Sequence, residues 1–299
     1  LYAQGFRPPV TNRVGGDAAN AATGAFEDFR IPIYSNTDDL DNYELGLKAE
    51  LFDRTLRLNA TAYYSEITDL QTSRFDPTNV SFLWFVDNVG EAEVTGIDGD
   101  FTWLAGQNLT ISGAFSLLET EITDLNPELD GITVPEGSEL PFTPEFSANL
   151  RARYDFEVDG VTDLPGLLGY VTGSIIYTGQ SLAGLKMDAY VQEDTLQRVY
   201  QVPSSGLSIQ REAAEFRGAA AGTELLGEEG IPGGRYEMGD YFLLNAAIGF
   251  NTDAWNAELF IDNLADERAE VYVDTQQFTP KVVTNRPRTI GLRVNYRFE

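Results

Sequence analysis

The stretch LRLNATAYY, residues 56–64, indicates which secondary structure the chain adopts. Its apolar side chains fall on every second position, namely Leu56, Leu58, Ala60, Ala62 and Tyr64. Polar side chains such as Arg57 and Asn59 occupy the positions between them. Strict alternation over this length predicts a β-strand with one apolar and one polar face. Because an arginine stands on the polar face, that face is expected to meet water.

The same period of two recurs along most of the chain. It is clearest in LTISGAFSL at residues 109–117, FSANLRARYDF at 146–156 and IGLRVNYRF at 290–298. With an opening strand at Leu1–Gly5, these patterns predict about ten strands, each near the ~9–11 residues that cross a bilayer as a tilted strand. No run approaches the ~18 consecutive apolar residues of a membrane helix. The predicted fold class is therefore all-β.

The connections between successive strands alternate between short and long. Short turns are predicted at Asp53–Thr55, Ala105–Asn108 and Asn251–Trp255. Long polar connections are predicted at Phe6–Asn42, Asp69–Asn88, Glu119–Pro144, Gly179–Gly239 and Ala265–Pro287. Outer-membrane barrels have short periplasmic turns and long extracellular loops. The pattern therefore predicts a portion of a transmembrane antiparallel up-and-down β-barrel.

Aromatic residues gather near the predicted strand ends. They are Tyr43, Phe52, Tyr64, Trp103, Phe156, Tyr177, Tyr241, Phe250 and Trp255. This placement suits the two aromatic girdles of a membrane barrel. The alternative is the ordinary preference of aromatic residues for any β-strand.

The composition excludes several classes of function. The chain has 47 acidic and 20 basic residues and a net charge of −27. Nucleic acid is not an expected partner, because binding phosphates needs clustered Lys and Arg. The chain has no cysteine and no histidine, which removes thiolate chemistry and His-containing catalytic triads. We expect no cofactor and no enzymatic activity, although no single carboxylate pair can be dismissed as a glycosidase site from the sequence.

Five segments in order resemble the second half of the β-barrel of TonB-dependent outer-membrane receptors. They are YAQGFRPP at 2–9, NYELGLKAELFDRTLRLNATAYYSEITDLQ at 42–71, NVGEAEVTGIDGDFTW at 88–103, LPFTPEFSANLRARY at 140–154, and AELFIDNLADERAEVY at 257–272 with RPRTIGLRVNYRF at 286–298. Each piece alone is weak, but the order of all five matches the family. The sequence departs from the family in ending on Glu299 after the aromatic Phe298.

The resemblance implies that residues 1–299 are part of a larger barrel of about 22 strands with a plug in its lumen. The plug and the first barrel strands are expected to lie outside this chain. The implied location is the outer membrane of a Gram-negative bacterium, with its lipid as one partner. The other implied partners are the TonB energy-coupling complex, acting through the plug, and a small nutrient ligand. A ferric siderophore is the leading candidate, with cobalamin or an oligosaccharide as alternatives.

Ligand contact in such a receptor is expected in the long outer loops. The residues we single out are Trp84, Phe85, Tyr190, Arg198, Tyr200, Arg211 and Tyr236. Aromatic rings with arginines nearby suit an anionic chelate or a flat ring system. The alternative is that these side chains only pack the loops against each other.

Two acidic loops raise the question of calcium, because hard cations bind several oxygen ligands. One loop contains Asp38, Asp39 and Asp41, and the other contains Asp124, Glu128 and Asp130. Their spacing matches no defined calcium loop, so we expect a solvated acidic surface and no metal site.

Two other functions remain open from the sequence. A passive porin or structural surface barrel would share the strand pattern without needing a plug. A soluble secreted β-sandwich that binds a ligand would also have alternating strands. A plug-like sequence upstream favours the receptor, whereas extraction as a monomer without detergent favours the β-sandwich.

Overall fold

A computed structural model describes residues 1–12, 32–75, 84–126, 136–158, 166–188, 234–274 and 281–298. Its main feature is a sheet of ten strands in the order β1-β2-β3-β6-β7-β8-β9-β12-β13-β16. The strands are β1 Tyr2–Arg7, β2 Asp38–Leu51, β3 Leu56–Thr68, β6 Gly90–Leu104, β7 Leu109–Leu125, β8 Phe146–Glu157, β9 Leu168–Thr178, β12 Tyr241–Asn251, β13 Trp255–Asp262 and β16 Thr289–Tyr296. Neighbours pair antiparallel throughout, as predicted. Within the described residues, no helix is both long and apolar enough to cross a membrane.

Several strands are longer than the sequence predicts. β6 has 15 residues and β7 has 17, against the ~9–11 needed to cross the bilayer. The extra residues lie at the loop end, where β7 continues to Leu125 through a segment predicted to be a loop. There β6 and β7 keep pairing across a β-bulge between Glu91 and Ala92. Pairing with a neighbour satisfies the backbone groups of both strands, so the ladder extends beyond the apolar band.

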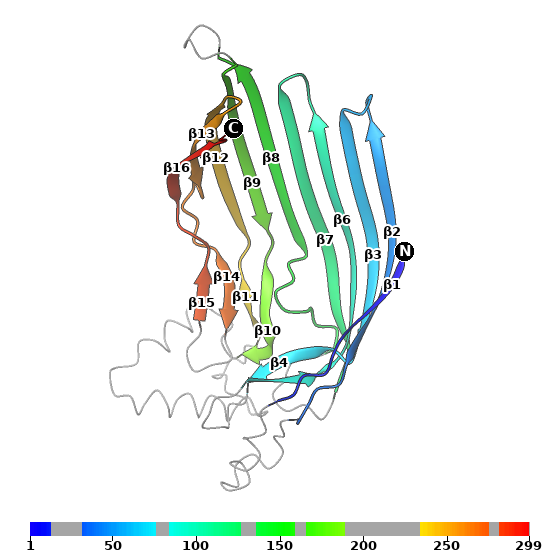
Figure 1. The fold of residues 1–299 in the computed structure, drawn as a ribbon. Coiled ribbons are helices and arrows are strands. Elements are labelled where there is room, and N and C mark those ends of the chain that lie inside the picture. The colour runs from blue at the N-terminus through cyan, green and yellow to red at the C-terminus, as the bar shows by residue number, and fades with distance from the viewer. Residues whose placement is uncertain are drawn as a thin grey trace, which may run out of the picture.

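Three short hairpins lie within the long connections. They are β4 Gln71–Phe75 with β5 Trp84–Asn88, β10 Ser181–Asp188 with β11 Gly234–Met238, and β14 Glu270–Asp274 with β15 Lys281–Thr284. Figure 1 places all three at the lower end of the sheet and the short turns at the upper end. The predicted sorting of connections is confirmed. The prediction of a loop throughout Asp69–Asn88 is wrong, because the β-favouring residues at its two ends pair with each other.

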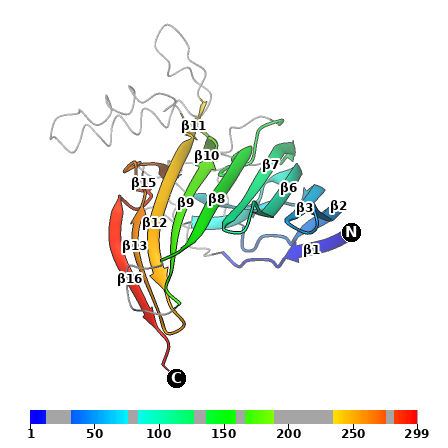
Figure 2. The same cartoon turned by 90° about the horizontal axis from the view of Figure 1, so that it is seen from above.

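The register gives the main sheet one apolar and one polar face. Leu47 of β2 pairs with Ala60 of β3, and Leu259 of β13 pairs with Leu292 of β16. Leu45 is 79% exposed and Leu292 is 70% exposed, although both lie within regular strands. So extensive an exposed apolar face suits contact with lipid and not with water. Figure 2 shows that the sheet curves strongly from β1 to β16, as a portion of a barrel wall does.

Aromatic rings on the apolar face form rows near both ends of the strands. The loop-end row is Tyr2, Tyr43 and Tyr64, continued by Phe146, Tyr177 and Phe242. At the turn end, the ring centroids of Phe156 and Phe250 are 6.4 Å apart. From Phe242 to Phe250 is roughly 27 Å along β12, close to the ~25 Å apolar band of outer-membrane barrels. Tyr241 is an exception to the predicted girdle, because its register with Thr178 puts it on the polar face.

On the polar face, Tyr170 of β9 links strands on both sides. Its hydroxyl donates to Glu258 of β13 at 2.9 Å and accepts from the side-chain amide of Asn256 at 3.2 Å. The guanidinium of Arg153 from β8 lies 3.9 Å from the ring centroid. The ring crosses β12 at Gly249, where an added Cβ would lie 2.3 Å from a ring carbon. Gly249 therefore leaves the space in which Tyr170 is buried.

Substitution Gly249→Ala is expected to lower the stability of the sheet, because the added methyl group displaces the Tyr170 ring. We expect a loss of about 1–3 kcal/mol, the usual range for overpacking, measured by urea unfolding of the full-length protein in detergent. The control is Gly173→Ala on β9, where the nearest atom to an added Cβ is 3.9 Å away. Equal stability of the two variants would contradict the packing role of Gly249.

Candidate functional site: the polar face and the rim of the sheet

The polar face contains a hollow of about 540 Å³ that extends over β3, β6, β7, β8 and β9. Its lining includes Thr61, Asp98, Ser116 and Ser147. These four residues form one row across neighbouring strands. Because their side chains are short, the wall is recessed at this point and offers polar groups to whatever lies against it.

Four charged side chains on this face have neither a hydrogen bond nor an ion pair within the part of the chain that the structure describes. They are Lys48, Arg57, Asp98 and Arg151, and all are exposed. Burying an unpaired charge against apolar groups costs several kcal/mol. The polar face is therefore compatible with water or with a polar body that supplies partners, and not with lipid.

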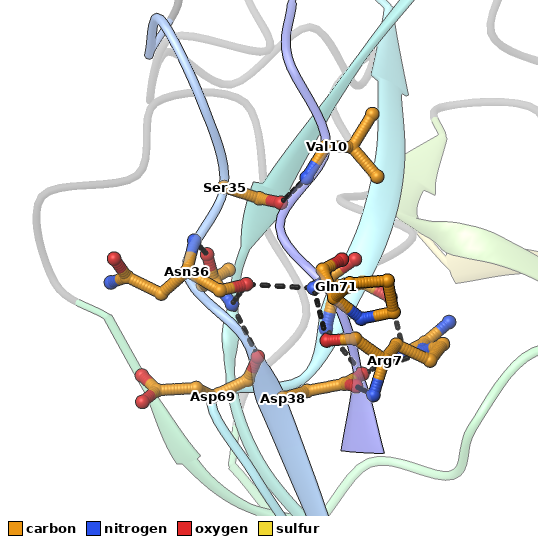
Figure 3. A network of polar contacts seen from close by, with 9 residues as sticks. Arg7, Val10, Ser35, Asn36, Asp38, Asp69 and Gln71 are labelled. Carbon is orange, nitrogen blue, oxygen red and sulfur yellow. Dashed lines mark hydrogen bonds and ion pairs between the residues drawn. The ribbon is translucent and has the colours of Figure 1, made fainter.

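At the loop end, Asp38 connects β1, β2 and β4 (Figure 3). Its carboxylate forms an ion pair with Arg7 and accepts backbone hydrogen bonds from Arg7 at 3.0 Å and Gln71 at 3.3 Å. Asp38 lies beyond the loop-end aromatic row, outside the apolar band, and its side chain is 5% exposed. Burial by itself raises the pKa of this carboxyl, but the hydrogen bonds and the charge of Arg7 outweigh burial and hold the pKa below its usual value.

The side chain of Gln71 binds the backbone of the preceding loop. Its Nε2 atom donates to the carbonyl oxygen of Asn36 at 2.7 Å and to that of Pro8 at 3.2 Å. Asn88, at the other end of the β4–β5 hairpin, donates to the same Asn36 oxygen at 3.2 Å. Both ends of the hairpin are therefore tied to one residue of the loop between β1 and β2, as Figure 3 shows for Gln71.

Asn12 and Ser35 extend this connection. Asn12 donates to the carbonyl of Val86 at 2.7 Å and accepts from the amide of Val86 at 2.8 Å. The Asn12 side chain therefore pairs with β5 as a neighbouring strand would. The hydroxyl of Ser35 accepts from the amide of Val10 at 2.9 Å. We call the contacts of Arg7, Asn12, Ser35, Asp38, Gln71 and Asn88 the rim network.

The predicted ligand-contact residues fall into two groups. Trp84 and Phe85 lie on β5, and Tyr236 lies on β11. Both strands belong to hairpins at the loop end of the sheet (Figure 1). Tyr190, Arg198, Tyr200 and Arg211 lie outside the described residues. The structure thus gives two separate backbone positions at the rim for these side chains, and their part in ligand contact remains a prediction.

The rim network is not predictable from the sequence pattern. Asp38 was expected on a solvated acidic surface, and this is wrong, because the residue is buried and paired with Arg7. The one available signal was the placement of Arg7 directly before Pro8 and Pro9. Proline ends a strand ladder, so the side chain before it stands at a strand end. Within the described residues, no group of three Asp, Glu, His or Cys side chains is arranged to hold a metal ion.

Comparison with known proteins gives the family. A family model described as TonB dependent receptor-like, beta-barrel, matches residues 2–264. The chain belongs to this TonB-dependent receptor family. The predicted resemblance is therefore confirmed, and the polar face of the sheet corresponds to the inside of a receptor barrel.

Individual relatives of this receptor chain are distant. The metal-pseudopaline receptor CntO of Pseudomonas aeruginosa is 28% identical over 163 residues, which are 52% of this chain and 20% of that protein. The ferric yersiniabactin uptake receptor FyuA from Yersinia pestis has a TM-score of 0.63 at 19% identity, over 100% of this chain and 34% of that one. The siderophore receptor PiuA from Acinetobacter baumannii has a TM-score of 0.58 at 17% identity, over 99% and 33%. The receptor chain thus spans about a third of the length of these structures.

Substitution Asp38→Asn is expected to loosen the β4–β5 hairpin, because a neutral amide cannot replace the charged partner of Arg7. Losing such a buried hydrogen-bonded group costs about 1–3 kcal/mol, which hydrogen exchange of the backbone amides at residues 84–88 will measure. The matched control is Asp53→Asn in the turn at the opposite end of the sheet, where residue 53 is exposed. Unchanged exchange at 84–88 in the Asp38 variant would refute the role of this carboxylate.

The Asp38 carboxylate also determines the pH below which the β4–β5 hairpin loses its protection from exchange. The folded-state pKa of Asp38 is lowered. The contribution of this carboxylate to the stability of the hairpin is therefore fully present above the unfolded pKa of about 3.9, and it is lost as the pH falls through the folded pKa. Protection at residues 84–88, corrected for intrinsic exchange, should therefore stay constant from pH 8 to about 5 and fall only below about 4. A decline between pH 7 and 5 would contradict the assignment.

Proposed function

We propose that the chain is part of an outer-membrane receptor that takes up a scarce nutrient by active transport. The cargo we favour is a ferric siderophore, with cobalamin and oligosaccharides as further candidates. The observation that supports this proposal is the combination of a lipid-suited outer face, a wet inner face and a rim organised by buried polar contacts. The names of the neighbours, which include receptors for siderophores and for a metal bound to pseudopaline, favour a chelated metal.

The proposed path of the ligand begins at the rim. Trp84 and Phe85 on β5, with Tyr236 on β11, are proposed to contact the ligand there. Tyr190, Arg198, Tyr200 and Arg211 are proposed to contribute from the connection between β10 and β11. Arginine forms paired hydrogen bonds with anionic oxygens, and aromatic rings stack on flat or hydrophobic parts of a chelator. Such a set of side chains suits an anionic metal chelate.

The inner face is proposed to hold a plug contributed by sequence outside these 299 residues. A polar body in the lumen would supply partners for Lys48, Arg57, Asp98 and Arg151, which lack them in the described structure. Strands outside the chain would likewise pair with the outer edges of β1 and β16. Energy for moving the plug is proposed to come from the TonB complex in the inner membrane.

The proposal is tested by uptake of radioactive iron in the bacterium that encodes this chain. Cells are grown without iron and supplied with one ferric siderophore at a time, such as ferric pyoverdine or ferric enterobactin. We expect saturable uptake of one of them, lost on deletion of the gene and abolished by a proton uncoupler. Uptake that does not saturate and survives the uncoupler would contradict active transport and indicate a passive pore.

The ligand residues are tested in the same cells. Trp84→Ala and Tyr236→Ala are expected to raise the half-saturating concentration about tenfold, a loss of about 1.4 kcal/mol in binding, with the maximal rate unchanged. The matched control is Trp103→Ala, which removes an outward-facing ring at the turn end of β6. An effect of Trp103→Ala equal to that of Trp84→Ala would show that the loss reflects barrel damage.

A further inference from the structure

Two small apolar clusters lie at the loop end, on different parts of the rim. The first contains Val89 and Ile122, both fully buried, with Leu70, Leu125 and Leu140 packed against them. The second contains Ala183, Met238 and Val273, from β10, β11 and β14. The first cluster adjoins the β4–β5 hairpin, whereas the second joins the other two hairpins.

The first cluster depends on the backbone at Gly90. Gly90 has a φ of +147°, and an added Cβ would lie 2.0 Å from the carbonyl oxygen of Asp124. Two backbone hydrogen bonds join Leu70 to this segment. The amide of Leu70 donates to the carbonyl oxygen of Gly90 at 2.7 Å, and the amide of Val89 donates to the carbonyl oxygen of Leu70 at 2.8 Å. The base of the β4–β5 hairpin is therefore fixed to β6 and, through Asp124, lies directly against β7.

The connection between β7 and β8 contacts the first cluster and two of the strands that carry the second. The amide of Leu140 donates to the hydroxyl of Thr120 on β7 at 2.9 Å, and its side chain packs in the first cluster. Two residues later, the amide of Phe142 donates to the carbonyl of Leu182 on β10 at 2.8 Å. The Phe142 ring stacks on Tyr272 of β14, with centroids 5.1 Å apart and planes at 23°. Leu140 and Phe142, two residues apart, thus join the first cluster to β10 and β14, the strands that carry Ala183 and Val273 of the second.

The backbone at Phe142 is in an unfavourable conformation. Its φ is +58°, a left-handed value that bulky side chains rarely adopt. Such conformations persist where surrounding contacts hold them, and they are concentrated at functional positions. Here the contacts are the hydrogen bond to Leu182 and the stacking on Tyr272. The left-handed turn lets the ring of Phe142 face β14 while Leu140 faces the first cluster.

We propose that Phe142 is a positioning residue that joins the rim loops into one cooperative unit. We call this unit the collar: residues 8–12 and 32–37, the three hairpins, and residues 136–145. Through Phe142, an opening of the β14 side of the collar is transmitted to the β4–β5 hairpin. The rim network and the first cluster complete the connection to the loop between β1 and β2.

The collar has a consequence for ligand capture, and this consequence rests on the proposed function. Trp84 and Phe85 stand on one hairpin and Tyr236 on another. A collar that holds both hairpins in place fixes the backbone positions from which these residues extend. Preorganisation of this kind reduces the ordering that binding would otherwise require. Phe142 would then influence affinity without contacting the ligand.

The test is hydrogen exchange of the full-length protein in detergent, without ligand. Phe142→Ala is expected to accelerate exchange at 270–274, which its ring contacts, and by roughly tenfold at residues 84–88 of the β4–β5 hairpin, a coupling in the range measured for interacting sites. Phe142→Tyr should restore protection, because a tyrosine ring stacks equally well. Phe146→Ala is the matched control, since that ring contacts Tyr177 on the outward face, with centroids 5.8 Å apart and planes tilted by 41°. This variant should leave exchange in both segments unchanged.

A second variant guards against misfolding of the first. Leu140→Ala weakens the first cluster and should accelerate exchange at 270–274, the reverse direction of transmission. The double variant of Asp38→Asn and Phe142→Ala should be non-additive at 84–88, whereas the effects of independent sites would add. The proposal is overturned if the effects of Phe142→Ala and Leu140→Ala stay local, or if the double variant is additive. Because no ligand is present, this result does not depend on whether transport of a siderophore is found.

Discussion

In the hydrocarbon of a bilayer, backbone N–H and C=O groups have no water to bind, so each must find a partner within the protein. The rest of this structure depends on that constraint. It explains why ten strands pair edge to edge in one continuous ladder and why the connections are confined to the two ends. Once the ladder exists, side chains must alternate between its faces. The apolar face then meets lipid, and the polar face is left for water or a plug.

Outside the apolar band the constraint changes, because water competes for every backbone group. At the loop end, side chains therefore form hydrogen bonds with the backbone groups of neighbouring segments, as neighbouring strands do within the sheet. The carboxylate of Asp38 and the amides of Gln71 and Asn12 bind backbone groups of neighbouring loops. Two small apolar clusters add non-polar contacts to this polar network. The rim is thereby connected across hairpins that are far apart in the sequence.

The sequence was sufficient for features that repeat with period two. Leu56 and Leu58 identified both the strand and its apolar face, and the sorting of turns and loops followed from composition. Tyr241 is an exception because nearness to a strand end does not decide the face: in YFLLNAAIGF it alternates with Phe242 and so stands on the face opposite Phe242 and Phe250. Asp38 and Gln71 could not be recognised, since Arg7 is 31 residues from the first and 64 from the second. Contacts of this kind leave no periodic trace, and the left-handed turn at Phe142 has no local residue that demands it.

The central claim is that the two faces of the sheet meet different solvents, and single cysteines along β8 test it most directly. The chain has no cysteine of its own, so each thiol introduced at residues 148–153 reports whether that one position is accessible from water or from lipid. In the full-length protein in lipid vesicles, the account predicts that positions 149, 151 and 153 react with a water-soluble maleimide once the lumen is accessible. Positions 148, 150 and 152 should be protected from it and should react instead with a lipid-soluble maleimide. Equal reactivity at all six positions would contradict the claim.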